Sequence, residues 1–555
     1  MNSPILTLLS ADSIRRNYAS GFWRNETIYA VTEAHARRAP DRIALRDAHR
    51  TVTYRELIEG ACAFAGDLAR RGVRPGQRVL TWMPDRIESV LALLACSRQG
   101  LVFCPSPHRN HTVSEVVALL ERTSCAAFLY QAGFGADGRQ RDIAPELSDL
   151  PWLLHSYRLG PSGAEPSAPL AEFTSGAFSF AVQTDAKTDP NTVVYLAFTS
   201  GSTGLPKGVM HSDNTLLATA RAIVSDWCLD DTTITYSLSP FGHNLGLGTL
   251  VTSLVCGGEF VIHDLPRGQS VLDRLAATGT NYLVGVPTHA IDLLDELRRR
   301  GGKGLERVKG FRISGAAVPG PVVAELLRFD VPPQCGYGMT ETCAHQYTRP
   351  DDDHRLIVET SGKACPGYDL RIWDADDRDR ELARGEIGEL GGRGASLMLG
   401  YFGDQASTEN CFNRYGFFMT GDLGWLDENG YLRITGRKKD VIIRGGHNIN
   451  PARIEDLVMQ HKAIERAAAI PVADGRVGEK ICLAVMFRAG RSASVEQILD
   501  HLDLAGLTKY EMPEYFLELP YIPLMPNGKI QKLDIMKWVQ DGTVKPVPVE
   551  RRQVG

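Results

Sequence analysis

The stretch Thr199-Ser-Gly-Ser-Thr-Gly-Leu-Pro-Lys-Gly208 directly follows an unbroken apolar run at residues 193–198, which predicts a buried strand. It combines three glycines, four hydroxyl side chains and one lysine. Glycines let backbone amides approach an anion closely, while hydroxyl groups and an ammonium add hydrogen bonds and charge. The stretch therefore predicts a polyphosphate-binding loop, with a plain flexible loop as the alternative. The common P-loop pattern does not fit, because Pro206 replaces its glycine and Gly208 follows the lysine.

Five further motifs follow in order along the chain. They are Tyr337-Gly-Met-Thr-Glu341, Thr420-Gly-Asp422, Gly436-Arg-Lys-Lys-Asp440, Gly445-Gly-His-Asn-Ile449 and Pro526-Asn-Gly-Lys-Ile-Gln-Lys532. With the first stretch, these motifs resemble the adenylate-forming superfamily, which includes acyl-CoA synthetases, luciferases and the adenylation domains of peptide synthetases. The resemblance spans residues 50–532. It is greatest to ligases of the cyclohexanecarboxylate-CoA and aryl-acid-AMP types.

Composition narrows the class of protein. The chain has 555 residues, of which 43% are hydrophobic and 23% charged, as in ordinary globular proteins of more than one domain. A net charge of -5 without a long basic block argues against nucleic acid as a partner. Eleven scattered cysteines without C-x-x-C pairs indicate a reducing compartment. The apolar patch at residues 4–9 is too short for a signal or a membrane span, so we expect a cytoplasmic enzyme without stable membrane insertion.

Alternating short strands and helices predict an α/β fold with helix-covered β-sheets. Two helix starts are predicted from capping patterns, one at Thr53 with Glu56 and one at Asp85 with Glu88. The apolar strand segments are residues 79–83, 193–198, 282–286 and 311–313, and helical segments include residues 270–277 and 321–329. The resemblance implies a large multi-subdomain N-terminal domain at 1–436, a hinge at 437–441 and a small mobile α+β domain at 442–555.

By resemblance, the chain joins a carboxylic acid to AMP and then to a thiol, using ATP, Mg²⁺ and coenzyme A. The ATP-binding residues that this implies are Thr199, Ser200, Gly201, Ser202, Thr203, Gly204, Lys207, Gly315, Ala316, Ala317, Tyr337, Gly338, Asp422 and Arg437. Glu341 would ligate the metal, and Thr340 would bond the α-phosphate. Lys529 resembles the lysine that stabilises charge in the adenylation transition state, while Lys439 lies at the position of the hinge.

The acid is less well defined than the reaction. His243 is expected as a catalytic gate between acid and nucleotide, and the acyl-binding residues are expected to be His243, Asn244, Gly315 and Gly338. Room is predicted at Gly242, Gly246 and Gly248, with apolar walls from Leu245, Leu247 and Val286. These features favour an alicyclic acid such as cyclohexanecarboxylate, or a medium-chain acid. The His243-Asn244 pair resembles that of aryl-acid ligases that load a carrier protein, and this is the alternative.

The acceptor and the protein partners are also expectations from the resemblance. The CoA-binding loop would contain Gly445, Gly446 and His447, whose glycines leave room for the pantetheine arm. A catalytically inactive binding protein is a further alternative, against which the intact Lys207, Glu341, Asp422 and Lys529 argue. A homodimer and a lysine acetyltransferase acting on Lys529 are the remaining expected partners.

Overall fold

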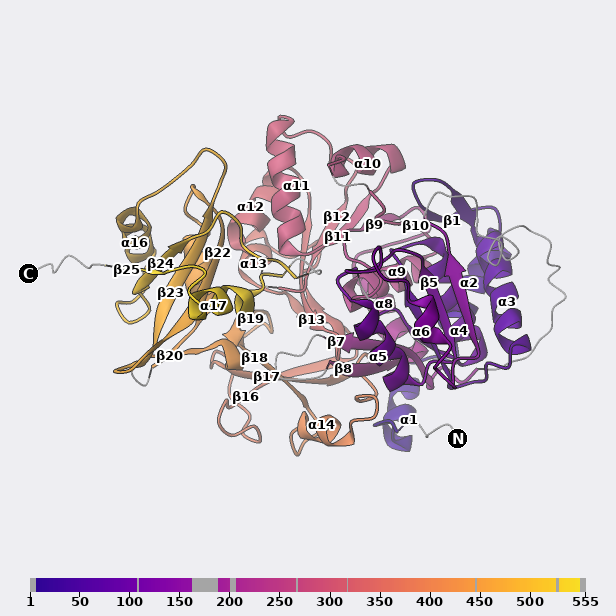
Figure 1. Cartoon of the computed structure of the whole chain (residues 1–555). Helices are drawn as coiled ribbons and strands as arrows, with labels where there is room; N and C mark the ends of the chain where they lie inside the picture. The colour runs from indigo at the N-terminus through magenta and orange to yellow at the C-terminus, as the bar shows by residue number, and fades with distance from the viewer. Residues whose placement is uncertain are drawn as a thin grey trace, which may run out of the picture.

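The computed structural model describes residues 6–106, 109–161, 188–199, 206–265, 268–316, 318–444, 447–525 and 529–549. Within these ranges the strands form four sheets, which Figure 1 shows side by side along the molecule. The fold is α/β, as the sequence predicts, and the C-terminal residues form a lobe with a sheet of its own.

The first sheet contains the strand that leads into the polyphosphate-binding stretch. Its order is β6 (His155–Leu159), β5 (Ala127–Gln131), β3 (Arg78–Trp82), β4 (Val102–Cys104), β7 (Val193–Thr199) and β8 (Lys207–Ser212). The strands run parallel except for β8, which returns antiparallel to β7. Helices α5 (Val113–Thr123) and α6 (Ala144–Leu147) pack on its outer face.

The second sheet carries the strand ends that surround the candidate site. Its order is β15 (Lys363–Ala364), β14 (Cys343–Tyr347), β13 (Pro333–Met339), β12 (Gly310–Ile313), β11 (Tyr282–Gly285), β9 (Ile234–Ser237), β10 (Glu259–Val261), β1 (Ile43–Arg46) and β2 (Thr51–Thr53). The central strands β9 to β13 are parallel. Helices α10 (Val271–Thr278), α11 (Pro287–Arg299) and α12 (Gly320–Arg328) cover one face, with α13 (His354–Glu359) beside α12.

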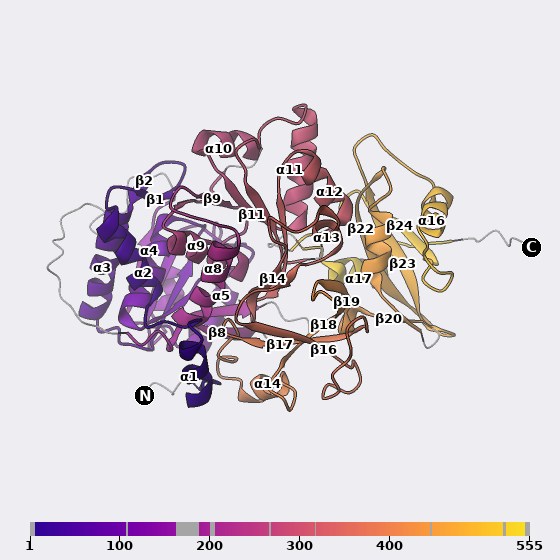
Figure 2. The ribbon, with the colours of Figure 1, turned by 180° about the vertical axis from the view of Figure 1, so that it is seen from behind.

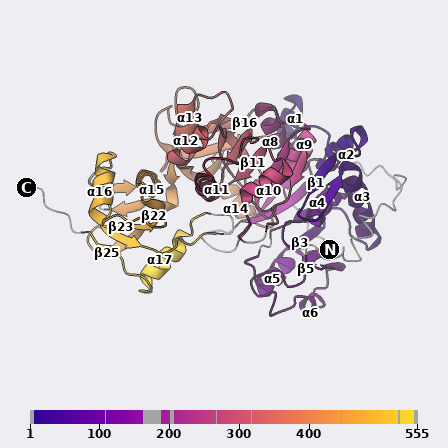
Figure 3. The same cartoon turned by 90° about the horizontal axis from the view of Figure 1, so that it is seen from above.

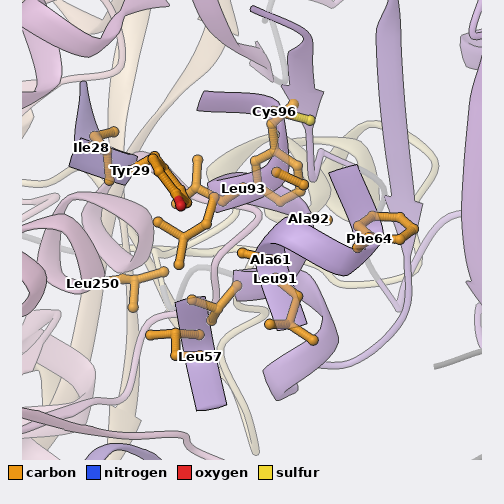
Figure 4. Packing of buried hydrophobic residues seen from close by; sticks show 14 of the residues in the cluster. Ile28, Tyr29, Leu57, Ala61, Phe64, Leu91, Ala92, Leu93, Cys96 and Leu250 are labelled. Carbon is orange, nitrogen blue, oxygen red and sulfur yellow. The ribbon is translucent and has the colours of Figure 1, made fainter. Parts of the chain in front are cut away.

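The largest apolar core lies between these two sheets. It is formed by α2 (Ile28–Arg38), α3 (Tyr54–Arg70), α4 (Ile87–Gln99), α8 (Asp213–Asp226) and α9 (Asn244–Cys256). Figure 4 shows side chains from α2, α3, α4 and α9 meeting in this core. Because α9 belongs to this core, its position is fixed by packing and not by its own sequence alone.

Local sequence accounts for one predicted helix start and not for the other. The Thr53 hydroxyl accepts a hydrogen bond from the Glu56 amide, and the Glu56 carboxylate accepts one from the Thr53 amide, so the predicted capping box at α3 is confirmed. The prediction at Asp85 is wrong: α4 begins after Arg86, which makes no side-chain cap. Asp85 instead accepts a hydrogen bond from the Phe241 amide at 3.0 Å, in the loop before α9.

The C-terminal part of the chain forms two further sheets. The antiparallel sheet consists of β16 (Tyr368–Trp373), β17 (Gly388–Gly394), β18 (Phe418–Leu426) and β19 (Leu432–Arg437), with α14 (Gln405–Asn410) nearby and α1 (Ala11–Ala19) at the N-terminal end. The last lobe contains the 3₁₀ turn η1 (Lys438–Asp440), strands β20 (Ile442–Arg444), β21 (His447–Ile449), β22 (Ile464–Asp474), β23 (Gly478–Phe487), β24 (Tyr515–Glu518) and β25 (Val547–Pro548), and helices α15 (Pro451–Val458), α16 (Val495–Leu504) and α17 (Lys532–Gln540).

The last lobe lies against α11 and α12, as the front and rear views agree (Figures 1 and 2). Arg466 of β22 forms an ion pair with Asp292 of α11 at 2.9 Å, and Arg488 pairs with Asp295 at 3.2 Å. The view from above shows the segment before α17 extending from this lobe toward the rest of the chain (Figure 3). Over the described ranges, no helix has the length and hydropathy that crossing a bilayer requires.

Candidate active site

Lys529 of the C-terminal lobe lies beside the carboxyl end of β12. Gly315 follows this strand with φ of +95°, and a Cβ atom placed on it would lie 3.7 Å from the Lys529 side chain and 3.4 Å from that of Val286. A glycine is favoured here by the positive φ, and its missing side chain leaves the approach to Lys529 open. Crevices at the carboxyl ends of parallel strands are the usual ligand sites of open α/β sheets.

Burial and neighbouring charges set the protonation of Lys529. Desolvation lowers its pKa from 10.5 to about 8, and the cations Arg437 and Lys439 act in the same direction. The carboxylates of Asp422 and Glu341 oppose this shift. The structure thus brings together residues from three distant motifs around one ammonium group, which is poised near physiological pH.

Two side chains hold the Asp422 carboxylate. One carboxylate oxygen accepts a hydrogen bond from the Tyr337 hydroxyl at 2.7 Å, and the other pairs with Nε of Arg437 at 2.9 Å. Asp422 and Tyr337 are both buried. Each carboxylate oxygen has a further lone pair, so the arrangement can accept the two hydroxyl groups of a ribose. It also fixes the Tyr337 ring, which is among the ATP-binding residues that the resemblance implies.

Glu341 is oriented by Tyr401, a residue that the motif analysis missed. The Tyr401 hydroxyl donates to Oε1 of Glu341 at 2.9 Å, and the Lys207 ammonium lies 4.7 Å from the Tyr401 ring. Burial raises the pKa of Glu341, while the Tyr401 hydrogen bond and Lys207 lower it. Tyr401 reaches this place because residue 401 bridges Val209 and its neighbours pair with β8. No local sequence pattern predicts such a pairing.

The residues around Glu341 fit a magnesium ion. Magnesium is typically held by one or two carboxylates together with substrate phosphates, and not by a cage of protein ligands. Glu341 is one buried carboxylate, and Lys207 beside it would attract the phosphates. Among the residues that the structure describes, there is no cluster of three histidine, cysteine or acidic side chains able to form an all-protein metal site.

His211 supports the turn that carries Thr340 and was also missed. One ring nitrogen lies 2.7 Å from the Thr340 carbonyl oxygen, and the other lies 3.1 Å from the Thr215 hydroxyl. Burial lowers the pKa of His211 to about 4, so the ring is neutral at pH 7 and can donate to the carbonyl. Its role is to position the Thr340 turn. A single histidine in an apolar strand gives no sequence signal for this.

His243 and Asn244 lie at the start of α9, facing the same site. Burial lowers the pKa of His243 to about 4, and the nearby Lys529 charge adds to the shift, so the ring is neutral. A Cβ atom on Gly248, one turn after Asn244, would meet nothing within 4 Å, as expected for a position that leaves room for a substrate. This open position favours an acyl pocket along α9.

Two other expectations about the acyl pocket are wrong. A Cβ atom on Gly246 would lie 2.2 Å from the Pro240 carbonyl oxygen, so this glycine is needed for close backbone packing and leaves no room for substrate. Leu247 is fully buried in the core between the two large sheets. Both residues lie on the side of α9 away from Leu245, which packs near β11 and β13. The 3.6-residue helical period separates these faces.

The remaining predicted residues fall into two groups. Thr199 ends β7, with its hydroxyl 3.5 Å from the Lys207 carbonyl oxygen, and Ala316 follows Gly315. Gly338 is required by the fold as well, because a Cβ atom there would lie 2.1 Å from the Cys343 carbonyl oxygen. Outside the described residues lie Ser200, Gly201, Ser202, Thr203, Gly204, Ala317, Gly445, Gly446 and the side chain of His447.

Comparisons with known proteins show the family and the fold of this chain. The model of a family described as AMP-binding enzyme matches residues 32–402. The medium-chain fatty-acid–CoA ligase of Escherichia coli is 30% identical over 93% of this chain and 91% of its own length. The salicyl-AMP ligase / salicyl-S-ArCP synthetase of Mycobacterium tuberculosis is 31% identical over 98% and 95%. The structure of ATP-bound MatB from Rhodopseudomonas palustris has a TM-score of 0.80 at 26% identity, over 92% of this chain and 100% of that chain.

Proposed function

Because the chain belongs to the AMP-binding enzymes, we propose that it is an AMP-forming acyl-CoA synthetase that activates a carboxylic acid with ATP and transfers the acyl group to coenzyme A. The observation that carries this proposal is the position of Lys529. A half-buried ammonium from the C-terminal lobe lies near Asp422, Glu341 and Arg437, where a nucleotide and an acid would meet. A structural lysine would gain nothing from such desolvation.

In the first step, a carboxylate oxygen attacks the α-phosphorus of ATP and pyrophosphate leaves. Both reactants are anions, so the site must neutralise charge and align them. Lys529 would contact the attacking carboxylate and the α-phosphate, Asp422 would hold the ribose, and Lys207 would bind the outer phosphates. Glu341 would hold magnesium, which supplies charge neutralisation when it is bound. In the second step, the thiol sulfur attacks the acyl carbon and AMP leaves.

The second step requires a thiol to reach the acyl-adenylate. We propose that the lobe at 442–555 turns about the hinge at 437–441 and thereby brings the loop at 445–447 to the site. The hinge lies at the end of β19 and in η1, next to Lys529, so that a rotation there would also withdraw Lys529. Only a few residues need to change their backbone angles for such a motion.

For the acid, the open position at Gly248 and the similarity to the Escherichia coli medium-chain ligase support a medium-chain or compact alicyclic substrate. The similarity to the Mycobacterium tuberculosis ligase and the place of Asn244 support one alternative, an aryl-acid ligase that loads a carrier protein.

One assay separates the two functions. Pyrophosphate release and thioester mass are measured with straight-chain, alicyclic and hydroxylated aromatic acids, each with and without free CoA. Thioester formation from straight-chain or alicyclic acids at low CoA concentration is the expected result. Pyrophosphate exchange with hydroxybenzoates, without any thioester from free CoA, would support carrier loading. An absence of pyrophosphate release with every acid contradicts both.

The protonation of Lys529 predicts a pH limit for the first step. Below pH 8 the side chain carries the charge that the phosphate and carboxylate need, and above pH 8 it loses this charge. The kcat/KM for ATP should therefore fall as pH rises through about 8, since this quantity reports the free enzyme. Bound ATP raises the pKa again, so kcat should fall only at higher pH. A pyrophosphate assay from pH 6.5 to 9.5 measures both. An unchanged kcat/KM across this range would contradict the prediction.

Removing the Tyr401 hydroxyl tests how Glu341 is oriented. Tyr401→Phe keeps the ring that faces Lys207 and deletes the hydrogen bond to the Glu341 carboxylate. We expect catalytic efficiency for Mg-ATP to fall about 10- to 100-fold, since hydrogen bonds to charged groups contribute roughly 1.5–3 kcal/mol. Tyr415→Phe, at a half-exposed position, is the matched control and should retain full activity. Equal activity of the two variants would rule out the role of Tyr401.

A further inference from the structure

Arg312 lies on the face of the nine-stranded sheet that looks toward α8 and α9. On β12, its neighbours Phe311 and Ile313 pack into the core under α11 and α12. Successive side chains of a strand point to opposite faces, so Arg312 points the other way. In register beside it, Val284 of β11 packs in one cluster with Leu245 of α9. Arg312 therefore lies between the sheet and the helix that carries Asn244 and Gly248.

The guanidinium of Arg312 is buried without an acidic partner. The residue is only 4% exposed, and its Nε has no hydrogen-bond partner. Among the described residues, no carboxylate pairs with it, and the titratable groups nearby are Tyr282, Tyr347 and Cys343. Burial lowers the pKa of Arg312, yet a guanidinium stays ionised inside proteins. A buried cation without a counter-ion is costly, and such sites normally bind an anion or a carbonyl oxygen.

The surroundings of Arg312 hold a second unpartnered donor. Gln334 is paired with it in the sheet register and is fully buried. The Tyr282 hydroxyl donates to the Gln334 side-chain oxygen, which leaves the Gln334 amide nitrogen without a partner. On the facing helix, the side-chain oxygen of Asn244 is a buried acceptor without a partner, and a Cβ atom on Gly248 would meet nothing within 4 Å. Arg312 and Gln334 are thus two neighbouring buried donors, and buried donors normally have an acceptor.

The chain between Arg312 and Gly315 limits the distance from Arg312 to the Lys529 side chain. Arg312 precedes Gly315, which lies beside Lys529, by three residues. Three residues of extended chain span at most about 10 Å. An acid whose carboxylate meets Lys529 and whose other end lies along α9 would therefore bring its distal atoms to Arg312. A purely hydrocarbon tail would cover this cation without accepting a hydrogen bond from it.

We propose that Arg312 is a specificity-determining residue of the acyl pocket and that the preferred acid carries an oxygen acceptor at its distal end. This inference rests on the proposed acid-activating function. Two classes of acid supply the required chemistry, those with a second carboxylate and those with a distal ketone. The carboxylate also supplies the missing counter-charge, so the dicarboxylic acids should show the larger effect.

Matched acid pairs test the proposal with the whole enzyme. Cyclohexanecarboxylate is compared with 4-oxocyclohexanecarboxylate and trans-cyclohexane-1,4-dicarboxylate, and octanoate with octanedioate. For each acid, kcat/KM is measured by pyrophosphate release. We expect the oxygen-bearing member to be used at least about tenfold more efficiently. A preference confined to the dicarboxylates identifies an anion as the ligand, and one shared by the ketone identifies a neutral acceptor.

Arg312→Met should remove this preference and improve the use of the plain acids, while Arg312→Lys should keep part of it. The control is Arg221→Met, which removes a guanidinium of α8 that pairs with Glu26. It should leave the ratio of kcat/KM between the oxygen-bearing and the plain acid unchanged. If Arg312→Met does not fold, the kcat/KM ratios of the wild type and of Arg312→Lys still test the proposal. Equal use of both members by the wild type overturns the proposal, as does an equal loss for all acids in Arg312→Met. If the enzyme is inactive with every acid tested, the proposed function itself is overturned.

Discussion

Lys529→Ala is expected to lower acid-dependent pyrophosphate release about 10²- to 10³-fold, the cost of removing one preorganised donor from a developing charge. The half-buried ammonium lies near Asp422, Glu341 and Arg437, and water would replace it without its charge. Its charge is needed while the carboxylate attacks phosphorus. Thioester formation from supplied acyl-adenylate and CoA should change less than about twofold, because the phosphate anhydride has already been broken at that stage.

The matched control for this variant is Lys537→Ala. Lys537 is an exposed lysine on α17, the helix that follows Lys529, and its loss should leave both half-reactions unchanged. Equal loss of both half-reactions in Lys529→Ala, with a lowered melting temperature, would indicate a damaged lobe and not a missing charge. An unchanged adenylation rate would refute the mechanism.

Glu341→Gln is expected to lower pyrophosphate release about 10²-fold or more, because a bound metal contributes several kcal/mol of charge stabilisation to such steps. The amide oxygen can still accept the Tyr401 hydrogen bond, so the local structure should persist. The metal, however, would lose its charged ligand. We therefore expect the Mg²⁺ concentration for half-maximal rate to rise. Titration of the rate against Mg²⁺ at fixed ATP measures this.

Two features make the glutamate test specific. Glu428→Gln changes an exposed carboxylate in the turn before β19 and should leave the Mg²⁺ dependence unchanged. Burial raises the pKa of Glu341, so the wild-type rate should also fall at acid pH as this carboxylate becomes protonated. Glu341→Gln should lack that acid limb. A retained acid limb, or an unchanged Mg²⁺ requirement, would exclude Glu341 as the metal ligand.

Local sequence was informative where chemistry depends on the backbone of one short segment. The glycine at position 315, the Thr340-Glu341 turn and the capping box at Thr53 are features of a few consecutive residues, so their residue types can be recognised directly. The helix that follows Asp85 shows where recognition from local sequence fails. Its sequence fits a cap, yet the carboxylate bonds the Phe241 amide, because a partner 156 residues away competes with the local amide.

The sequence by itself determined the fold class, the strand that leads into Thr199 and the residue types that phosphate and carboxylate chemistry require. Only the tertiary structure decided which side chains meet. Tyr401 reaches Glu341 through a bridge to β8, Leu247 turns away from the pocket with its helical face, and Arg312 points toward α9 because its neighbours belong to another core. Non-local pairing and packing set these contacts, and neither leaves a periodic signal within one segment.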